Sequence, residues 1–449
     1  MTTATHTVRS ARRLRSAALL AALLACATCT HGDITVVEPA AKGPNDSLAL
    51  TIVPDGEDAA AAAALGWKAG IPGAEVIIAP SVKPNADGPG DTATGPPIAT
   101  LVTDSTGHVS VPDLPSGWYY IEVRRWLTGA ERGRLTAGAD LIGFATHRVV
   151  QRGSATLTLP GSHRRSIVIS EASSFVENVT TTTAYGYGGY LELANNSDTT
   201  VYLDGLVIGL FFAATESSVF PGRCAREGPF LNDPDGIWVY YMDSLPGTGH
   251  DYPLAPGALA LIATDAIDHR PLSPLFGLDL SQANFEMVGT EDADNPSVPN
   301  SVVIGPNGAW DPLHGMLFSV GLASAIVVAL PVDTGSLPKR LYDPHQGYAT
   351  AWQERIPRDH ILDVLDAFWP NLVTVYNELC PFQVSSTFDR QPAPLWWSSL
   401  PDGTWWSLSA YSIQRKAAFT RADGRMILQD TRSTEADFYV GLRTPFQLP

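Results

Sequence analysis

Two pairs of adjacent tryptophans flank a strong turn signal in the C-terminal part of the chain. The turn residues are Pro401, Asp402 and Gly403, which predict a β-hairpin. Neighbouring side chains on a strand point to opposite faces, so one indole of each pair would enter the core and the other would face solvent. The outward indoles could form a flat platform for a sugar ring or a partner surface, and plain core packing is the alternative. The candidate binding residues are Trp396, Trp397, Trp405 and Trp406.

Acidic side chains gather in short stretches that are typical of loops. Asp292, Asp294 and Asn295 form one group, and Asp233 with Asp235 forms a second. Calcium takes carboxylate and amide oxygens on loops as ligands, so the first group is a candidate calcium site. The same residue types are common in ordinary turns, which is the alternative for both groups.

Two further segments repeat an aspartate followed by a histidine. They contain Asp311 with His314 and Asp343 with His345. A bound metal could link these side chains, and simple turns are the alternative. We expect the protein to have no cofactor. Calcium is the one possible exception that the sequence indicates.

The sequence lacks the motifs of several common enzyme classes. It contains no G-x-S-x-G elbow, no H-E-x-x-H, no P-loop and no dinucleotide-binding G-x-G-x-x-G. Its 10 histidines are scattered, with no pair spaced to share one face of a helix or strand. We therefore predict a non-enzymatic protein. The alternative is a secreted hydrolase of polysaccharide or nucleic acid that uses acidic-loop carboxylates as acid and base.

The first 25 residues have the organisation of a targeting segment. Four arginines precede a short apolar run, and Leu23, Leu24, Ala25 and Cys26 have the order of a lipoprotein cleavage box. The run is too short to span a bilayer as a mature helix. We predict a signal peptide over residues 1–25, a lipid on Cys26 and a tether over residues 26–46. Secretory cleavage that leaves Cys26 unmodified is the alternative.

The charge balance argues against nucleic acid as a partner. The chain has 29 basic and 46 acidic residues, a formal net charge of −17. Removal of residues 1–25 takes away four arginines and no acids, leaving 25 basic residues and a charge near −21. Such a surface repels nucleic acid and anionic lipid, so we expect the lipid to be the contact with the membrane.

The chain has four cysteines. Cys26 is the lipidation candidate and Cys29 lies in the predicted tether. Cys224 and Cys380 remain, both in loop-like settings, and could form a disulfide in an oxidising compartment. Two separate free thiols are the alternative.

Composition and residue patterns predict a mainly β protein. The 449 residues include 39 glycines and 35 prolines, and frequent Thr, Val and Tyr favour short strands separated by turns. Residues 47–160 predict a small β-sandwich. Within it, the alanine run at 58–65 is either a helical turn or a loop, and residues 124–150 contain either a further hairpin or a short helix.

A second, larger domain is expected over residues 166–449. Residues 166–210 predict two strands joined by a tight polar turn at 195–198. Further strands are expected at 236–242, 259–263 and 325–330. Residues 359–368 have helix-like spacing of Ile361, Leu362, Leu365 and Phe368, which predicts a short helix packed on the sheet.

Ordered sequence blocks in this larger domain carry a family resemblance. The stretch ISEA…GGYLELANNSDTTVYLDGLVIG (169–209) resembles the opening of a lamin-tail-like domain. Together with residues 279–286, 292–300, 412–416, 424–431 and 437–438, it resembles an uncharacterised family of bacterial secreted lipoproteins. The resemblance implies an immunoglobulin-type β-sandwich with long insertions, and it implies a location but no activity.

The smaller domain carries a second resemblance. PGAEVII…TDSTGHVSVPDLPSGWYYIEV (72–123) resembles a carboxypeptidase-regulatory-like, prealbumin-type domain. In such a domain Gly107 would permit the positive φ of a hairpin and Gly117 the turn before the next strand. Modules of this kind are usually spacers or docking units.

Taken together, the sequence predicts an exported lipoprotein of the outer membrane or cell surface, built from two β-sandwich domains. Its expected role is binding or adhesion. The family that it resembles also suggests an accessory role in uptake. Its expected partners are the membrane, through the N-terminal lipid, and a glycan or an outer-membrane uptake protein.

Overall fold

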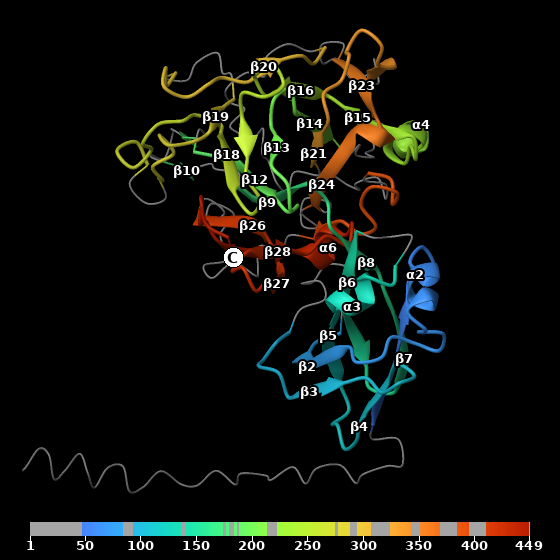
Figure 1. Ribbon diagram of the computed structural model, residues 1–449. Helices are drawn as coiled ribbons and strands as arrows, with labels where there is room; N and C mark the ends of the chain where they lie inside the picture. The colour runs from blue at the N-terminus through green and yellow to red at the C-terminus, as the bar shows by residue number, and fades with distance from the viewer. Residues whose placement is uncertain are drawn as a thin grey trace, which may run out of the picture. The chain divides into compact units, whose positions relative to one another are not determined.

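Strands make up most of the regular structure between Ser47 and the C-terminus (Figure 1). The computed structural model describes residues 47–83, 93–135, 140–173, 177–178, 184–185, 188–212, 222–273, 277–287, 294–306, 324–342, 351–368, 384–394 and 410–448. Residues Ser47–Pro449 form one compact unit. The predicted mainly β fold is confirmed, and its multiple sheets agree with the predicted β-sandwich domains.

Residues 47–163 form two sheets around one hydrophobic core. Sheet 1 has the strand order β4-β1-β7, and sheet 2 has the order β3-β2-β5-β6-β8. The strands of sheet 1 are β1 (Leu48–Pro54), β4 (His108–Val111) and β7 (Ser154–Leu159). The strands of sheet 2 are β2 (Glu75–Ser81), β3 (Ala99–Val102), β5 (Trp118–Trp126), β6 (Leu141–Gln151) and β8 (Gly161–His163).

Alternation along these strands builds the core. Leu48, Leu50 and Ile52 of β1 are buried against Val76 and Ile121 of sheet 2. The alanine run forms helix α2 (Ala59–Ala64). The stretch at 124–150 contains both of its predicted alternatives, because α3 (Gly129–Arg132) connects β5 to its antiparallel neighbour β6.

Two six-stranded sheets and one three-stranded sheet follow. Their strand orders are β19-β18-β12-β9-β26-β29 in sheet 3, β20-β16-β14-β21-β24-β25 in sheet 4 and β15-β23-β22 in sheet 5. Sheet 3 comprises β9 (Ile167–Ser173), β12 (Tyr190–Asn195), β18 (Leu259–Ala263), β19 (Phe285–Glu286), β26 (Tyr411–Arg415) and β29 (Phe438–Leu442). Sheet 4 comprises β14 (Val207–Phe212), β16 (Tyr241–Ser244), β20 (Val302–Val303), β21 (Ser324–Ala329), β24 (Ile361–Phe368) and β25 (Ala393–Pro394). Sheet 5 comprises β15 (Gly236–Val239), β22 (Lys339–Tyr342) and β23 (Ala351–Pro357).

Smaller elements connect and cover these sheets. Two-stranded pairs are formed by β10 with β11, β13 with β17, and β27 with β28. Their bounds are β10 (Glu177–Asn178), β11 (Ala184–Tyr185), β13 (Val201–Tyr202), β17 (Pro253–Leu254), β27 (Ala417–Thr420) and β28 (Met426–Leu428). The remaining helices are α4 (Arg223–Leu231), the 3₁₀ turn η4 (Arg358–His360) and α6 (Thr434–Asp437). Among the described residues, the helices are all too short or too polar to cross a membrane.

Sheet 4 is buried on both faces. Ile208 and Leu210 of β14 join the core between sheets 3 and 4. Val207 and Phe211, whose side chains lie on the opposite face of the strand, join a second core with Val239 of sheet 5. Because each face of the sheet needs apolar side chains, β14 is a continuous apolar run and not an alternating one.

The predicted pair of strands within residues 166–210 is wrong in its pairing. β12 pairs with β9 and β18 in sheet 3, whereas β14 pairs with β16 and β21 in sheet 4. The polar turn at 195–198 is held by other parts of the chain, because Asn195 donates to Leu254 O and Asn196 donates to Leu428 O. The turn therefore leads from one sheet to the next instead of closing a hairpin.

The predicted helix at 359–368 is also wrong, because these residues form η4 and strand β24. The spacing of Ile361 and Leu365 imitates a helix face, with Asp363 and Asp366 on the opposite side. β24 lies inside sheet 4 and is apolar toward both cores, and both aspartates are buried. The strand predicted at 259–263 is confirmed. That at 325–330 is β21, and that at 236–242 divides into β15 and part of β16.

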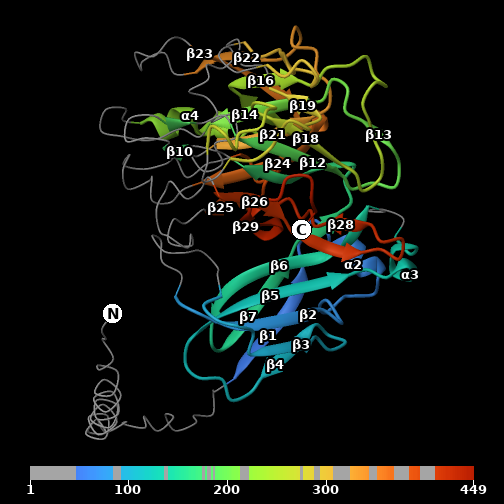
Figure 2. The same cartoon turned by 90° about the vertical axis from the view of Figure 1, so that its left-hand side faces the viewer.

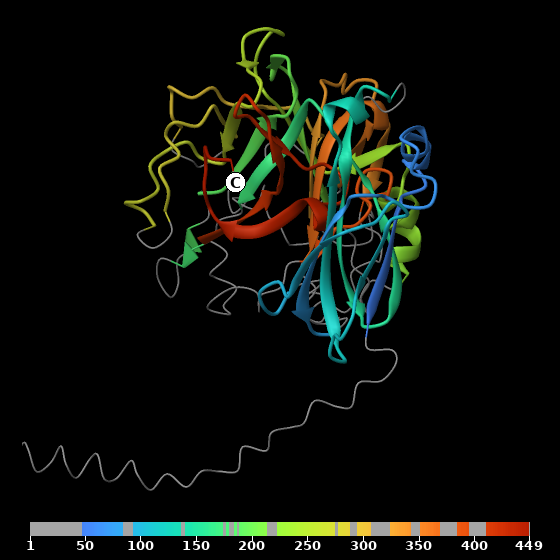
Figure 3. The same ribbon diagram turned by 60° about the horizontal axis from the view of Figure 1, so that its bottom comes forward.

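The C-terminal elements contact sheet 2. The rings of Trp126 on β5 and Phe419 on β27 are 6.2 Å apart, and the red C-terminal strands lie beside the cyan strands (Figure 3). Arg390 also forms ion pairs with Asp55 at 2.5 Å and with Glu57 at 2.7 Å. These contacts join the first two sheets to the rest of the compact unit.

Candidate functional site

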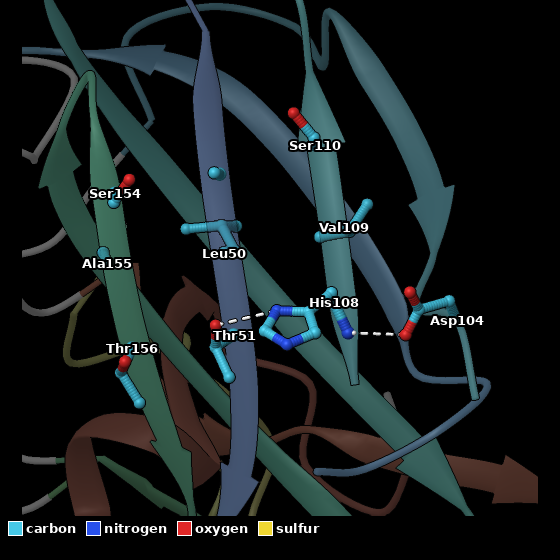
Figure 4. A pocket seen from close by; sticks show the side chains of 10 residues that line it. Leu50, Thr51, Asp104, His108, Val109, Ser110, Ser154, Ala155 and Thr156 are labelled. Atoms are coloured by element: carbon cyan, nitrogen blue, oxygen red, sulfur yellow. Dashed lines mark hydrogen bonds between the residues drawn. The ribbon is translucent and has the colours of Figure 1, made fainter. Parts of the chain in front are cut away.

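The outer face of sheet 1 carries an open groove of about 480 Å³ (Figure 4). All three strands of the sheet and the turn before β4 contribute to it. Its lining residues are Ala49, Leu50, Thr51, Asp104, His108, Val109, Ser110, Ser154, Ala155 and Thr156.

Strand register places the groove side chains in two rows across the sheet. Ser110, Ala49 and Ser154 form one row, because Ala49 is paired with both neighbours. His108, Thr51 and Thr156 form the next. The central strand has the smaller side chain in the first row, so the flanking strands rise on either side of it. Alternation sends Leu48, Leu50 and Ile52 into the core and leaves these small polar residues outside.

The turn before β4 fixes His108. Asp104 Oδ1 accepts hydrogen bonds from Thr106 N at 2.8 Å, Thr106 Oγ1 at 2.7 Å and His108 N at 3.0 Å. The bond from the His108 backbone, followed by those from Thr106, lowers the pKa of Asp104. Gly107 has a φ of +79°, and an added Cβ would lie 2.7 Å from the carbonyl oxygen of Ile52. The turn predicted at Gly107 is therefore present.

The groove presents hydroxyl groups and one imidazole. His108 Nδ1 lies 2.9 Å from Thr51 Oγ1, which holds the ring against the central strand (Figure 4). Asp104 bonds the backbone of His108 and not its ring, so these three residues do not form an Asp-His-Thr relay. Hydroxyls and an imidazole can donate and accept hydrogen bonds with a polyhydroxylated ligand.

The local sequence pattern does not by itself reveal this groove. The available signal is the alternation in Ser154–Leu159, where each outward residue carries a hydroxyl, together with the small outward residues Ala49 and Thr51. These residues form a groove only because β1 lies between β4 and β7 in the sheet. The parallel pairing of β1 with β7 joins segments far apart in the chain, and composition does not indicate it.

Most of the residues predicted as sites lie outside the described part of the chain. These are Cys26, Cys380, Asp292, Trp396, Trp397, Trp405 and Trp406, as well as the segments with Asp311 and Asp343. Lipidation, the indole platform and the metal sites on those segments stay predictions. Cys224 is described. It packs beside the core of sheets 4 and 5 and is disulfide-bonded, and its pairing with Cys380 also stays a prediction.

The described members of the predicted calcium group make turn contacts. Asn295 Oδ1 accepts from Ser297 N at 3.1 Å, and its Nδ2 donates to Ala266 O at 2.7 Å. Asp294 Oδ1 accepts from Asn300 Nδ2 at 2.7 Å. Within the described ranges, His, Cys, Asp and Glu side chains form no group of three that could hold a metal. Calcium stays a prediction because Asp292 lies outside those ranges.

The second acidic pair is part of the scaffold. Asp233 accepts hydrogen bonds from Trp238 Nε1 at 2.9 Å, from Asp235 N at 2.9 Å and from Arg355 at 3.1 Å. Burial opposes ionisation, but these donors outweigh it and lower the pKa of Asp233. Asp233 and Asp235 therefore belong to an ordinary turn, which was the alternative to a metal site for this pair.

Other carboxylates are buried within the sheets. Arg415, 1% exposed, contacts Asp363 and lies 3.7 Å from Asp437 and 4.0 Å from Asp430. Its guanidinium also donates to Ile169 O at 2.6 Å. This buried cluster ties β9, β24 and β26 together.

A second carboxylate pair anchors the C-terminal segment to the outer face of sheet 3. Glu171 accepts from Thr444 N at 3.0 Å, and Glu192 accepts from Phe446 N at 2.6 Å and Ser170 Oγ at 2.9 Å. Burial raises the pKa of Glu192 to about 7, although these two hydrogen bonds oppose the shift.

The fold and the groove define the class as a layered β-sandwich protein with a hydroxyl-lined surface groove. Residues 255–444 match the sequence profile of DUF4876, a family described as a protein of unknown function. No curated protein matches the chain.

Three solved structures resemble it. A DUF4876 family protein from Bacteroides thetaiotaomicron is 16% identical, covers 90% of this chain and 98% of its own, and gives a TM-score of 0.46. A candidate carbohydrate binding protein from Bacteroides uniformis is 10% identical, with coverages of 72% and 100% and a TM-score of 0.15. A candidate cell adhesion protein from Bacteroides eggerthii is 11% identical, with coverages of 64% and 75% and a TM-score of 0.14.

Proposed function

We propose that this protein is a non-enzymatic binding component of the bacterial cell envelope, attached to the membrane by a lipid on Cys26. It would bind a glycan or the surface of an outer-membrane uptake protein, and act in adhesion or as an accessory in uptake. The observation that carries this proposal is the hydroxyl-lined groove on sheet 1. The lamin-tail-like and carboxypeptidase-regulatory-like assignments stay predictions.

The groove suits binding because its polar groups are already in place. Thr51 holds the ring of His108, and Asp104 holds the backbone on which that ring stands. A ligand that meets fixed donors and acceptors loses less free energy to the ordering of side chains than one that meets mobile ones. Serine and threonine hydroxyls on three neighbouring strands match the spaced hydroxyls of a glycan.

The state of the carboxylates also supports binding over hydrolysis. Shifted carboxyl pKa values often mark catalytic acids and bases. Here Asp233 is held by Trp238 and Arg355, and Glu192 holds the backbone of Phe446. Among the described residues that line the groove, Asp104 is the one carboxylate, whereas glycoside hydrolysis uses a facing pair.

A substitution that fills the groove tests the proposal. The purified protein is screened on a glycan array and in pull-downs from outer membranes, with wild type and Thr156→Trp compared. We expect Thr156→Trp to weaken binding at least about tenfold, because the indole occupies the trough next to Thr51. Thr100→Trp is the matched control, since Thr100 is exposed on β3 of sheet 2 and does not line the groove.

Equal binding by wild type and Thr156→Trp would remove the groove from the proposal. Trp405→Ala and Trp406→Ala then test whether the predicted indole platform is the binding surface. If neither screen finds a ligand for the wild type, the binding function itself is contradicted.

Attachment to the membrane has its own test. Cys26→Ser is expected to move the protein from the membrane fraction to the soluble exported fraction and to abolish palmitate labelling, because the acylated thiol is removed. Cys29→Ser is the control and should leave both unchanged. A mature wild-type protein that begins upstream of residue 26 would contradict lipidation.

A further inference from the structure

Two aromatic rings form an exposed stack away from the groove. The rings of Tyr202, on β13, and His250, in the loop before β17, are 4.5 Å apart between centroids and inclined by only 20°. Both residues are exposed, with Tyr202 at 42%. Figure 2 shows β13 and the yellow-green loops at the side of the large sheets instead of between them.

A buried carboxylate fixes the loop that carries His250. Asp204 accepts backbone hydrogen bonds from Gly249 at 2.9 Å, Asp251 at 2.8 Å and Tyr252 at 2.9 Å. Within the loop, Asp251 Oδ2 accepts from Thr248 N at 2.8 Å and Thr248 Oγ1 at 2.7 Å. The loop is therefore held on both sides of His250 without use of the imidazole.

Tyr202 is supported from the opposite side. It is paired with Pro253 in the short ladder between β13 and β17, and the next residue, Leu203, donates from N to Tyr252 O at 3.0 Å. The ring of Tyr252 packs on Phe285 at 4.9 Å, which belongs to the core between sheets 3 and 4. Both backbones that carry the stacked rings are thus anchored to the fold.

The described part of the chain leaves the polar atoms of the stack unused. Within the described ranges, neither the Tyr202 hydroxyl nor a ring nitrogen of His250 makes a hydrogen bond. Thr200 and Thr248, each two residues before one of the two rings, are exposed and polar. A protein interface centres on desolvated apolar surface, whereas a sugar needs one aromatic face with polar groups around it.

We propose that Tyr202 and His250 form a carbohydrate platform that binds one face of a pyranose ring. In a β-linked glucose unit the axial C–H bonds lie on both faces of the ring and can pack on the outer face of the stack, while the equatorial hydroxyls reach sideways to the phenol hydroxyl or the imidazole. The inference rests on the proposed binding function and adds a second glycan-contacting surface to it.

Titration with defined sugars tests the platform. The probes are the hexasaccharides of β-1,4-linked glucose and of β-1,4-linked galactose, and Kd is measured by isothermal titration calorimetry. We expect Tyr202→Ala and His250→Ala each to raise the Kd of the hexasaccharide that binds by about tenfold. Tyr202→Phe keeps the ring and should stay within about threefold of wild type. Tyr439→Ala, at an aromatic residue 39% exposed on β29, is the matched control and should bind as wild type does.

The outcomes separate this inference from the proposed function. Unchanged binding by both alanine variants overturns the platform, and so does a Tyr202→Phe loss as large as that of Tyr202→Ala. If Thr156→Trp still weakens glycan binding in that case, the proposed function stands. The platform is also overturned if neither hexasaccharide binds the wild type. The same holds if the alanine variants lose binding to a protein partner but bind the hexasaccharide as the wild type does. Far-UV circular dichroism and the urea midpoint confirm that each variant is folded, and His250→Ala leaves the Asp204 contacts intact.

Discussion

Arg415 shows how single residues hold the larger sheets together. Its guanidinium is buried among Asp363, Asp430 and Asp437 and donates to backbone oxygens of two segments. Replacing it with Met would leave the carboxylates buried without their cation. Removal of one partner from a buried ion cluster costs about 3–5 kcal/mol. We expect Arg415→Met to lower the free energy of unfolding by that amount, as measured by urea titration.

An exposed ion pair supplies the comparison for Arg415. Arg270 pairs with Asp268 at 2.7 Å, but its side chain is 61% exposed. Solvent screens such pairs, so we expect Arg270→Met to change the free energy of unfolding far less than Arg415→Met does. Similar losses in Arg270→Met and Arg415→Met would show that burial does not set the strength of the cluster.

The sequence does not indicate that the carboxylates of this cluster are buried. Asp363 and Asp430 are polar residues in a strongly acidic chain, and nothing in their spacing separates a buried role from a solvated one. Their partner Arg415 is distant in sequence. Gly107, in contrast, was predictable, because a glycine within a polar turn signals a positive φ by itself.

Residues 359–368 could be a helix or a strand by their spacing, and the two alternatives place Asp363 in different surroundings. On a helix Asp363 and Asp359 would both lie on the polar side, equally exposed. In the strand Asp363 is buried, accepts from Ile169 N at 2.7 Å and contacts Arg415. Asp363→Ala should therefore lower the free energy of unfolding by about 3–5 kcal/mol. Asp359→Ala, at an exposed position in η4, should change it by no more than about 0.5 kcal/mol.

Equal effects of the two aspartate substitutions in urea titration would contradict the strand. More generally, the sequence indicated that strands exist, since alternating and apolar runs mark β18 and β21. It did not indicate partners. Ala172 of β9 pairs with Ile413 of β26, and no local pattern connects these segments. The groove on sheet 1 depends on the same kind of long-range pairing, so the local sequence does not indicate it.

Two titratable groups, His163 and Glu192, change the stability in the same direction with pH. Burial opposes protonation of His163, but Asp140 and Asp58 outweigh it and raise its pKa to about 9, above the unfolded value near 6.5. The resulting stability is complete below pH 6.5 and is lost as the pH rises through 9. Burial raises the pKa of Glu192 to about 7, so folding also becomes less favourable between about pH 4.5 and 7.

From His163 and Glu192 we expect Tm to fall from about pH 6.5 toward pH 9, as followed by calorimetry. Burial lowers the pKa of His147 and His269, which makes folding less favourable below about pH 6.5. Below about pH 4 the stabilising effect of Asp58 and Asp140 is lost, because their folded pKa values are lowered. His163→Gln should flatten the decline between pH 6.5 and 9. His250→Gln is the control and should keep it. Parallel profiles for His163→Gln and wild type would rule out His163 as its source.

The position of β1 would have a mechanical consequence if the protein is anchored through Cys26 as proposed. β1 is hydrogen-bonded on both sides, antiparallel to β4 and parallel to β7, and the chain enters it directly from the segment that carries Cys26. In a protein anchored as proposed, a bound surface that pulls the protein away from its anchor would apply force along the length of this strand. The two ladders are then sheared together, so that many hydrogen bonds must rupture at once instead of unzipping one by one.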